Sequence, residues 1–306
     1  MTTHSVASNR GPWSSDLAIA YRIYPQLSQS VQGLPFSEDK LQLSEMCLRS
    51  LKESLGSLRV KLWVLLDGCP KEYEELFRKY FAEEDLVLVP LCGIGNQATF
   101  AKQIQLLLEQ QECEVVYFAE DDYFYLPGEF RCMIEFLRAR EDVHFVTPYD
   151  HLDYYTMALH GPPACSVTFG NRQWRTAAST CLTFLTRRET LAKTEAAFRN
   201  YKRRSLDCSL WLSLTKNRVF NPFFFASQLF REPFYCKIVV KSWLYFWRQI
   251  LFGDKWMLWV PVPAVATHLD SNALSPNVDW RAFMERAQRE GTSESPALKY
   301  NEPSPR

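Results

Sequence analysis

Three consecutive carboxylates, Glu120, Asp121 and Asp122, directly follow the apolar run at residues 115–119. Such a run predicts a strand that is buried on both faces, as in a parallel sheet covered by helices. Open α/β sheets bind their ligands at the C-terminal ends of such strands. Adjacent carboxylates repel one another unless a cation lies among them, and Mg²⁺ or Mn²⁺ would bind their oxygens together with substrate phosphates. A solvated acidic turn is the alternative, which the buried strand disfavours.

Four other residues stand where a ligand could bind. Asp67 ends the apolar run at residues 60–66, so it either contacts a ligand over the strand end or is an ordinary turn aspartate. Gly95 and Asn96 precede a helix, where glycines let a backbone approach a phosphate or simply form a turn. Asp207 begins an apolar helix, where the helix dipole alone would also favour an acid.

Composition limits the classes of protein that the chain can belong to. Its 306 residues, 47% of them apolar, suffice for one large α/β domain or two small ones. The 35 basic and 35 acidic residues cancel, so we expect no nucleic-acid partner. Nine cysteines without a Cys-x-x-Cys pair indicate free thiols in a reducing cytoplasm. We expect a cytoplasmic protein, since neither a signal sequence nor an apolar run of membrane-spanning length is present.

The elements that must position these residues alternate along the chain. Apolar runs predict strands at residues 17–21, 60–66, 86–91 and 115–119, and amphipathic stretches predict helices at 40–55, 71–83, around 100–108 and from about 128. This order is typical of a doubly wound parallel sheet. Further strands are expected at 143–148 and 180–186 and a helix at 189–198, whereas residues 161–178 read as a loop.

The stretch at residues 231–252 predicts an unusually apolar helix. Lys237, Lys241 and Arg248 fall on one face of it, among tryptophan, tyrosine and phenylalanine side chains. Such a helix is either covered by the rest of the protein or lies on a membrane surface, and both interpretations stay open. Residues 1–15 are expected to be disordered, and residues 283–306 are expected to form a flexible tail.

Over residues 15–282 the chain resembles a family-2 type glycosyltransferase of the GT-A fold, because four features match that family in order. Asp67 resembles the strand-end acid that holds the uracil and ribose of the donor. Glu120-Asp121-Asp122 resembles the acidic DxD motif, Asp207 resembles the acid of the "ED" motif, and His268 resembles the C-terminal histidine of the metal site.

The resemblance implies a fold and a domain division. The fold is α/β, a single Rossmann-like GT-A domain with a mostly parallel central sheet flanked by helices, plus a C-terminal helical extension. The domain would span residues 16–282, with a nucleotide-sugar half at about 16–125 and an acceptor half at about 126–270.

The resemblance also implies a role for each site residue. Asp67, Gly95, Asn96, Glu120, Asp121 and Asp122 would bind the nucleotide-sugar. Asp122 and His268 would hold the divalent metal, Mn²⁺ or Mg²⁺. Asp207 would be the base that deprotonates the acceptor hydroxyl, and Arg203 or Arg204 would keep it ionised. Residues proposed near the acceptor are Asp150, Asp153, Tyr154 and Trp174, because aromatic rings suit a sugar and the two acids are alternative bases.

The implied activity is inverting, metal-dependent transfer of a hexosyl group from a nucleotide-diphosphate sugar to a hydroxyl of a glycan or lipid-linked acceptor. The resemblance favours a UDP-sugar as the donor. Two alternatives remain, a sugar nucleotidyltransferase and an inactive GT-A domain that binds sugar or acts as a scaffold. If the helix at residues 231–252 lies on a membrane, the protein would be peripheral at the inner face of that membrane.

Overall fold

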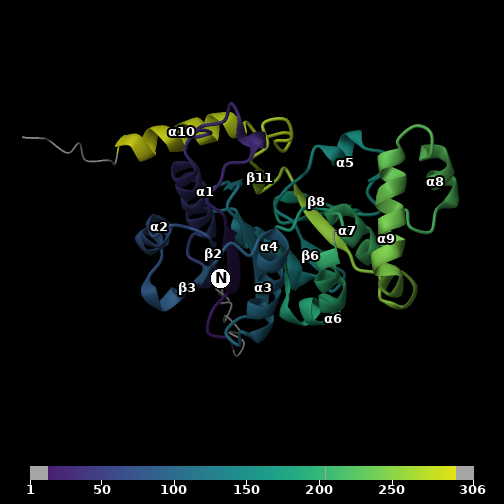
Figure 1. The fold of residues 1–306 in the computed structure, drawn as a ribbon, viewed down its shortest axis with the longest axis horizontal. Helices are drawn as coiled ribbons and strands as arrows, with labels where there is room; N and C mark the ends of the chain where they lie inside the picture. The colour runs from purple at the N-terminus through teal and green to yellow at the C-terminus, as the bar shows by residue number, and fades with distance from the viewer. Residues whose placement is uncertain (1–12, 204, 294–306) are drawn as a thin grey trace, which may run out of the picture.

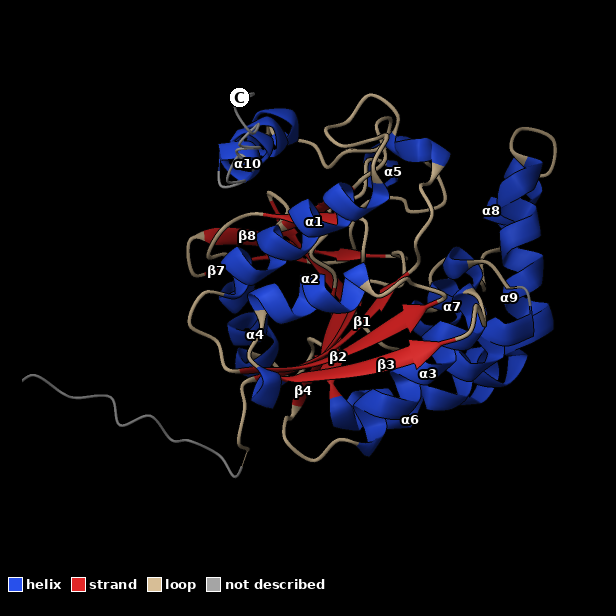
Figure 2. Ribbon diagram, turned by 60° about the vertical axis from the view of Figure 1, so that its left-hand side comes forward, coloured by secondary structure: helices blue, strands red, loops and turns tan. Residues whose placement is uncertain are grey.

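The computed structural model describes residues 13–203 and 205–293. Its centre is a nine-stranded mixed sheet with the strand order β3-β2-β1-β4-β9-β6-β10-β8-β7 and helices on both faces (Figures 1 and 2). Within the described residues, β8 and β9 run against the other strands of this sheet. The strands are β1 Leu17–Ile23, β2 Val60–Asp67, β3 Leu86–Leu91, β4 Val115–Glu120, β6 Phe145–Val146, β7 Ser166–Phe169, β8 Arg172–Ala177, β9 Phe184–Arg187 and β10 Leu258–Val262.

A small second sheet pairs β5 (Tyr123–Tyr125) with β11 (Ala266–His268). This pairing is antiparallel and aligns His268 with Tyr123, the residue after the acidic triplet. The chain's C-terminal part therefore returns to the end of β4.

Helices cover the sheet because its strands are apolar on both faces. Leu17, Ile19 and Tyr21 of β1 pack with α1, α2 and α4, whereas Ala18 and Ala20 pack with α3, α6 and α7. The helices are α1 Lys40–Leu55, α2 Glu72–Tyr80, α3 Asn96–Glu109, α4 Phe130–Ala139, α5 Asp153–Thr156, α6 Arg188–Arg199, α7 Asp207–Thr215, α8 Pro222–Gln228, α9 Pro233–Phe252 and α10 Trp280–Ser293.

The predicted α/β class is confirmed, with a mostly parallel sheet, flanking helices and a C-terminal helix. The core of the prediction is the parallel block β3-β2-β1-β4, in which β1 lies between β2 and β4. Its register sets Arg22 of β1 opposite Glu120 of β4, and Asp67 is the last residue of β2. Polar residues at the ends of neighbouring strands therefore meet at one edge of the sheet.

Two expectations were wrong. Residues 161–178 are not a loop throughout, because β7 and β8 form an antiparallel hairpin around the turn at Gly170 and Asn171. A flexible tail does not start at residue 283, since α10 extends from Trp280 to Ser293. Trp280 and Met284 of α10 are buried, and they pack in a cluster that includes Met46 of α1. Residues 294–306 lie outside the described residues.

The N-terminal boundary also differs in part from the expectation. Residues 1–12 lie outside the described part of the chain, but the backbone N–H of Ser15 donates to the carbonyl of Glu112. The guanidinium of Arg188 lies 5.9 Å from the ring centre of Trp13. Residues 13–15 are therefore in contact with the domain and are not part of a detached segment.

The apolar helix predicted at residues 231–252 is present as α9. One side of it packs on α7, with Ile238 and Val239 buried beside Leu212. Phe246 has non-helical backbone angles and marks a kink. Among the described residues, no helix combines the length and the apolar character needed to cross a bilayer.

Candidate active site

A cavity of about 390 Å³ opens at the C-terminal ends of β1, β2 and β4. The structure brings together there every nucleotide-binding residue predicted from the sequence. The cavity is lined by Arg22, Ile23, Tyr24, Gln26, Ser28, Val31, Lys40, Leu43, Asp67, Gly93, Gly95, Asn96, Thr99, Glu120, Asp121 and Asp122. Its position at the carboxyl ends of parallel strands is where open α/β sheets bind their ligands.

Glu120 is held by residues on both sides of its strand. One carboxylate oxygen forms an ion pair with Arg22, whose guanidinium also donates to the side chain of Asn96. The other oxygen accepts a hydrogen bond of 2.7 Å from Thr183 Oγ1. Because both oxygens are engaged, Glu120 fixes the Arg22 guanidinium at the cavity wall.

Asp121 forms an ion pair with Lys40, the first residue of α1, with 2.6 Å between Oδ2 and Nζ. The same oxygen accepts a hydrogen bond from the backbone N–H of Tyr24 at 3.3 Å. Burial and the neighbouring Asp122 carboxylate raise the pKa of Asp121 even though Lys40 opposes them. The cavity is therefore lined by two cationic side chains, Arg22 and Lys40, beside its four acids.

Asp122 and His268 meet as predicted, with 3.1 Å between Oδ2 and Nε2. Burial alone would raise the pKa of Asp122, but the facing imidazolium outweighs that effect and lowers it. Burial disfavours the charged imidazole, yet Asp122 raises the pKa of His268 to about 9. Without a metal, the two side chains therefore form an ion pair.

The donor set fits a hard divalent ion that is shared with a substrate. Asp122 Oδ1 is buried and accepts no hydrogen bond from the described residues, so it has a free coordination position. Two ligands of one octahedral ion lie about 3 Å apart, which matches the spacing of Asp122 and His268. No group of three or more His, Cys, Asp or Glu side chains suited to a metal occurs among the described residues. Ions such as Mg²⁺ often bind through one or two carboxylates, water and phosphate oxygens.

Asp67 serves the loop before α3 in this structure. It is only 3% exposed, and its two carboxylate oxygens accept hydrogen bonds from the backbone N–H groups of Ile94 at 2.7 Å and Gly95 at 2.8 Å. Gly93 and Gly95 have φ of +67° and +82°, angles that favour glycine. Asp67 therefore shapes the loop that lines the cavity, and both of its oxygens are already engaged.

Asp207 lies at the start of α7 near the Arg22–Glu120 pair. Burial and the Glu120 carboxylate raise its pKa above the usual value, while a hydrogen bond from Tyr201 and the Arg22 charge act in the opposite direction. Asp207 is not one of the residues that line the cavity. Arg203 or Arg204 was expected to be the cationic partner of Asp207, but the side chain of Arg203 and all of Arg204 lie outside the described residues. Among the described residues, the positive charge of Arg22 lowers the pKa of Asp207.

The four residues predicted near the acceptor divide into two kinds. Asp150 is fully buried, forms an ion pair of 2.6 Å with Arg175 and accepts a hydrogen bond of 2.5 Å from Tyr155. Trp174 is buried against Phe136 with ring centres 4.0 Å apart, so its ring packs in the core, and its contact with an acceptor stays a prediction. Tyr154 is buried, and its hydroxyl donates to the carbonyl of Ser179 at 2.6 Å.

Asp153 differs from these three because its side chain is 41% exposed, and its Oδ2 lies 3.6 Å from His151 Nδ1. The charge of His268 acts on the pKa of His151, which places His151 near the Asp122–His268 pair. Asp153 therefore stays a candidate for contact with an acceptor.

Sequence reasoning missed Arg22, Lys40, Thr183 and Tyr201. Arg22 and Lys40 could have been suspected, since one is the last residue but one of the first strand and the other begins the first helix beside Asp39. Thr183 and Tyr201 reach Glu120 and Asp207 through contacts between elements that are remote in sequence, so no local pattern marks them.

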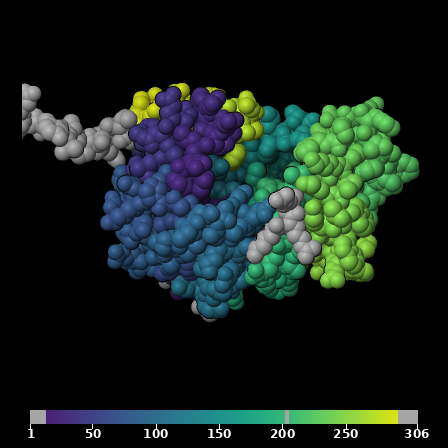
Figure 3. All heavy atoms as spheres, viewed as in Figure 1, coloured from purple at the N-terminus to yellow at the C-terminus, as the bar shows by residue number. Residues whose placement is uncertain are grey.

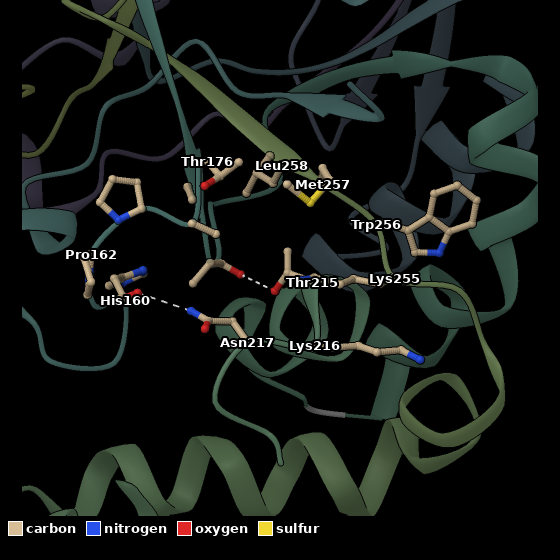
Figure 4. Close-up of a pocket in the computed structure, with 14 residues that line it drawn as sticks. His160, Pro162, Thr176, Thr215, Lys216, Asn217, Lys255, Trp256, Met257 and Leu258 are labelled. Carbon is tan, nitrogen blue, oxygen red and sulfur yellow. Dashed lines mark hydrogen bonds between the residues drawn. The ribbon is translucent and has the colours of Figure 1, made fainter. Parts of the chain in front are cut away.

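A second, smaller cavity of about 110 Å³ lies between β8, α7 and the start of β10 (Figure 4). Asn217 donates to the His160 carbonyl at 3.2 Å and Thr215 to the Ala178 carbonyl at 2.9 Å. The Lys216 ammonium donates to the Gly253 carbonyl at 2.6 Å. None of the predicted site residues lines this cavity.

No protein-family model matches the chain, and no curated protein sequence is significantly similar to it. Among solved structures, S. aureus TarS 1–349 in complex with UDP aligns at 13% identity and a TM-score of 0.41, covering 65% of this chain and 54% of that one. The galactosyltransferase LgtC, in complex with donor and acceptor sugar analogues, aligns at 10% identity and a TM-score of 0.43 over 90% of this chain and 95% of that one. A mannosyltransferase from Pyrobaculum calidifontis, in complex with GDP-Man and Mn²⁺, aligns at 12% identity and a TM-score of 0.41, covering 78% and 73%.

The chain spans about half the length of the TarS structure that it matches. All three TM-scores lie below 0.5.

Proposed function

We propose that the protein is an inverting glycosyltransferase of the GT-A type, which transfers a hexosyl group from a nucleotide-diphosphate sugar to an acceptor hydroxyl. The observation that supports this proposal best is that the acidic triplet lines one cavity, with His268 in contact with Asp122 and Asp207 near the Arg22–Glu120 pair. These residues come from β4, β11 and α7, which lie far apart in the sequence. They are also the residues that the resemblance to family-2 glycosyltransferases singles out.

The donor would occupy the 390 Å³ cavity. We assign the loop that Asp67 holds and the start of α3 to the nucleotide, because backbone N–H groups at a helix N-terminus favour anions. Lys40 and Arg22 add positive charge at the same wall, although Asp121 and Glu120 partly neutralise it. UDP is the first nucleotide to test.

Asp122 and His268 would hold a Mn²⁺ or Mg²⁺ ion. When bound, such an ion neutralises the charge that develops on a departing diphosphate. Because a histidine must be neutral to bind a metal, His268 would have to lose the proton that its raised pKa favours. Metal binding is therefore expected to compete with protons, and to be weaker in acid than in mildly alkaline solution.

Asp207 would accept the proton of the acceptor hydroxyl as that oxygen attacks the sugar carbon. A single displacement of this kind inverts the anomeric configuration and needs no covalent intermediate. The raised pKa suits a base, because a carboxylate that holds a proton more firmly is a better acceptor for it. Asp153 is the nearest alternative among the predicted acids, since it is partly exposed and close to His151.

The test is a donor screen with the purified full chain. UDP-, GDP- and CDP-sugars are incubated with Mn²⁺, and release of nucleoside diphosphate is measured with and without a chelator. We expect release with one donor, its loss in chelator, and its loss in Asp122→Ala but not in Asp254→Ala, a matched change at an exposed position. Donor hydrolysis that persists unchanged in chelator would refute the metal assignment.

Two further measurements on the same protein separate the alternatives, namely incubation with a nucleoside triphosphate and a sugar phosphate, and calorimetry with a nucleotide-sugar. A sugar nucleotidyltransferase would release pyrophosphate from a nucleoside triphosphate and a sugar phosphate. An inactive sugar-binding domain would give a calorimetric binding signal with a nucleotide-sugar but no release of diphosphate. Either outcome would refute the proposed transfer reaction.

A further inference from the structure

The pair α8 and α9 lies at one end of the molecule (Figures 1 and 3). It carries large apolar side chains that are exposed to solvent. Phe223, Phe230 and Phe252 are 86%, 92% and 78% exposed. We call the exposed apolar side chains of this segment the outer face: Phe220, Phe223, Leu229, Phe230, Phe234, Val240, Leu244, Trp247, Leu251 and Phe252. A concentration of exposed large apolar side chains on one segment is characteristic of an interaction site.

The outer face is not the side by which α9 packs on the rest of the protein. The opposite side of α9 is already buried, because Ile238 and Val239 pack against Leu212 of α7. The hydroxyl of Ser209 on α7 donates to the carbonyl of Ile238 at 3.1 Å, which ties the two helices together. A helix that is packed on one side and apolar on the other must meet a second apolar environment or leave that side in water.

Charge identifies the kind of surface that the outer face fits. Residues 216–256 contain seven basic residues (Lys216, Arg218, Arg231, Lys237, Lys241, Arg248 and Lys255) and two acidic residues (Glu232 and Asp254), a net charge of +5. The whole chain has 35 of each, so the remainder carries −5. The apolar surface therefore lies in a part of the chain that carries a positive net charge, whereas the rest of the chain is negative.

The basic and apolar side chains share one side of α9. Lys237 and Leu244 lie seven residues apart, about two turns, on one side of α9 before the kink at Phe246, and Arg248 and Leu251 follow the kink three residues apart. All four are exposed. Lysine and arginine beside exposed tryptophan, phenylalanine and leucine are characteristic of helices that lie in the interface of a bilayer.

We propose that the outer face of α8 and α9 docks the protein on an anionic lipid bilayer, with its aromatic side chains inserted among the lipids and its basic side chains on the head groups. A second copy of the chain fits less well, because a symmetric contact would bring two segments of net charge +5 together. The proposal concerns surface docking only, which agrees with the finding that no described helix could span a membrane.

Docking would place the candidate active site close to the lipids. Helix α7 lies against α9, and Asp207 is its first residue. Packed helix axes are about 8–10 Å apart, so α9 is the one helix layer that would separate α7 from the lipids. This consequence, that the acceptor is carried by a membrane lipid, rests on the proposed function, whereas the docking itself does not.

The test measures binding of the full chain to vesicles by flotation, with no donor or acceptor present. Vesicles of phosphatidylcholine containing phosphatidylglycerol are compared with pure phosphatidylcholine vesicles, at low and high salt. We expect binding to the anionic vesicles that weakens with salt, because the attraction to surface charge is screened. Failure of the wild-type chain to float with anionic vesicles would overturn the proposal, whatever the outcome of the donor screen.

Two variants separate the apolar and electrostatic contributions. Phe223→Ser with Phe230→Ser should lower the partition coefficient by about tenfold or more for each ring removed from the lipid. Lys237→Gln with Arg248→Gln should lower it by about 30-fold, at about fivefold for each charge. Because all four side chains are exposed, the fold should be retained, which circular dichroism checks.

Matched controls come from other surfaces. Phe283→Ser removes an exposed phenylalanine from α10, and Lys71→Gln with Arg131→Gln removes two exposed charges near α2 and α4. Neither control should change vesicle binding. Equal losses of vesicle binding in the variants and in the controls would overturn the assignment to this face. The assignment would also be overturned if the wild-type chain self-associates and does not bind vesicles, and if Phe223→Ser with Phe230→Ser converts it to a monomer.

Discussion

Replacing Asp207 with asparagine tests the assignment of the base, because the change removes a proton acceptor and almost nothing else. Asp207 lies in the first turn of α7, where Leu206 is the N-cap residue, and its side chain accepts a hydrogen bond from Tyr201 that an asparagine oxygen can also accept. The variant keeps the shape of the side chain and loses one negative charge. It also relieves the repulsion by Glu120 that contributes to the raised pKa of Asp207.

The expected effects on stability and on turnover differ widely. A charge in the first turn of a helix contributes about 0.3–1 kcal/mol, and the relief from Glu120 offsets part of that, so the free energy of unfolding should change by less than about 1 kcal/mol. General base catalysis contributes about 10²–10⁴-fold, which is about 3–5 kcal/mol in the activation free energy at 1.36 kcal/mol per decade. The kinetic effect should therefore exceed the structural one severalfold.

The assay measures turnover with a saturating donor, and donor affinity by calorimetry. Asp207→Asn should reduce turnover by at least 100-fold with donor affinity nearly unchanged. Glu189→Gln is the matched control, because Glu189 is an exposed acid in the first turn of α6. Turnover within a few-fold of wild type, in a folded Asp207→Asn protein, would refute the reasoning and direct attention to Asp153.

The pH profile gives an independent check on the same residue. A base works only when ionised, so activity should fall as the pH decreases through the pKa of Asp207, which lies above that of an ordinary aspartate. Tyr201→Phe removes a hydrogen bond that lowers this pKa. The acidic limb of the profile should therefore move to higher pH in that variant, a shift that a purely structural Asp207 would not produce.

Three further predictions need no substrate. Asp67→Ala leaves the N–H groups of Ile94 and Gly95 without their acceptor and should destabilise the protein by about 1–3 kcal/mol in urea denaturation, whereas a loss under 0.5 kcal/mol would show that water replaces the carboxylate. Asp150→Ala leaves the Arg175 guanidinium without its partner, although that side chain is only 13% exposed, and should lower the free energy of unfolding by about 3–5 kcal/mol. If the unpaired charge is the cause, adding Arg175→Met to Asp150→Ala should partly restore stability. Burial lowers the pKa of His160 from 6.5 to about 4. The contribution of the neutral His160 to stability is therefore fully present above pH 6.5 and is lost as the pH falls from there towards 4. In thermal melts, His160→Gln should lose less stability than the wild type over this pH range.

Local patterns predicted those elements whose signals lie within one segment. The helix at residues 40–55 was placed correctly because apolar residues recur at helical spacing after Asp39, whose side chain caps the backbone N–H of Gln42 at 3.0 Å. The strand at residues 86–91 was also placed correctly. In both segments, local propensity and burial favour the same structure.

The errors arose where the decisive contact is remote or a turn signal was overlooked. The β7–β8 hairpin has a Gly170-Asn171 turn, which is a recognised hairpin signal, but the surrounding proline, arginine and polar residues resemble a loop. The charged sequence of α10 predicts a tail. Only the packing of α10 on α1 shows that Trp280 belongs to the core.

The candidate site was predictable as a set of acids and not as a network. The positions of Asp67, Glu120, Asp121 and Asp122 follow from the rule that parallel strands end at one edge of a sheet. Their partners, however, are contributed by other segments: Lys40 by α1, Thr183 by the residue before β9 and His268 by β11. Contacts across 63 to 146 residues of sequence leave no periodic signal.

The hydrogen bonds from Ile94 and Gly95 to Asp67 make these two amides natural reporters of the site. Ile94 is 45% exposed, so an unbonded amide in this loop would exchange its hydrogen with solvent rapidly. If the nucleotide is to contact the Asp67 carboxylate, the loop must give up at least one of these bonds, and exchange at that amide should then become faster. If Asp67 only shapes the loop, a bound nucleotide should slow the exchange of both amides. Hydrogen exchange at two backbone positions thus distinguishes an aspartate that binds a ligand from one that holds the loop in place.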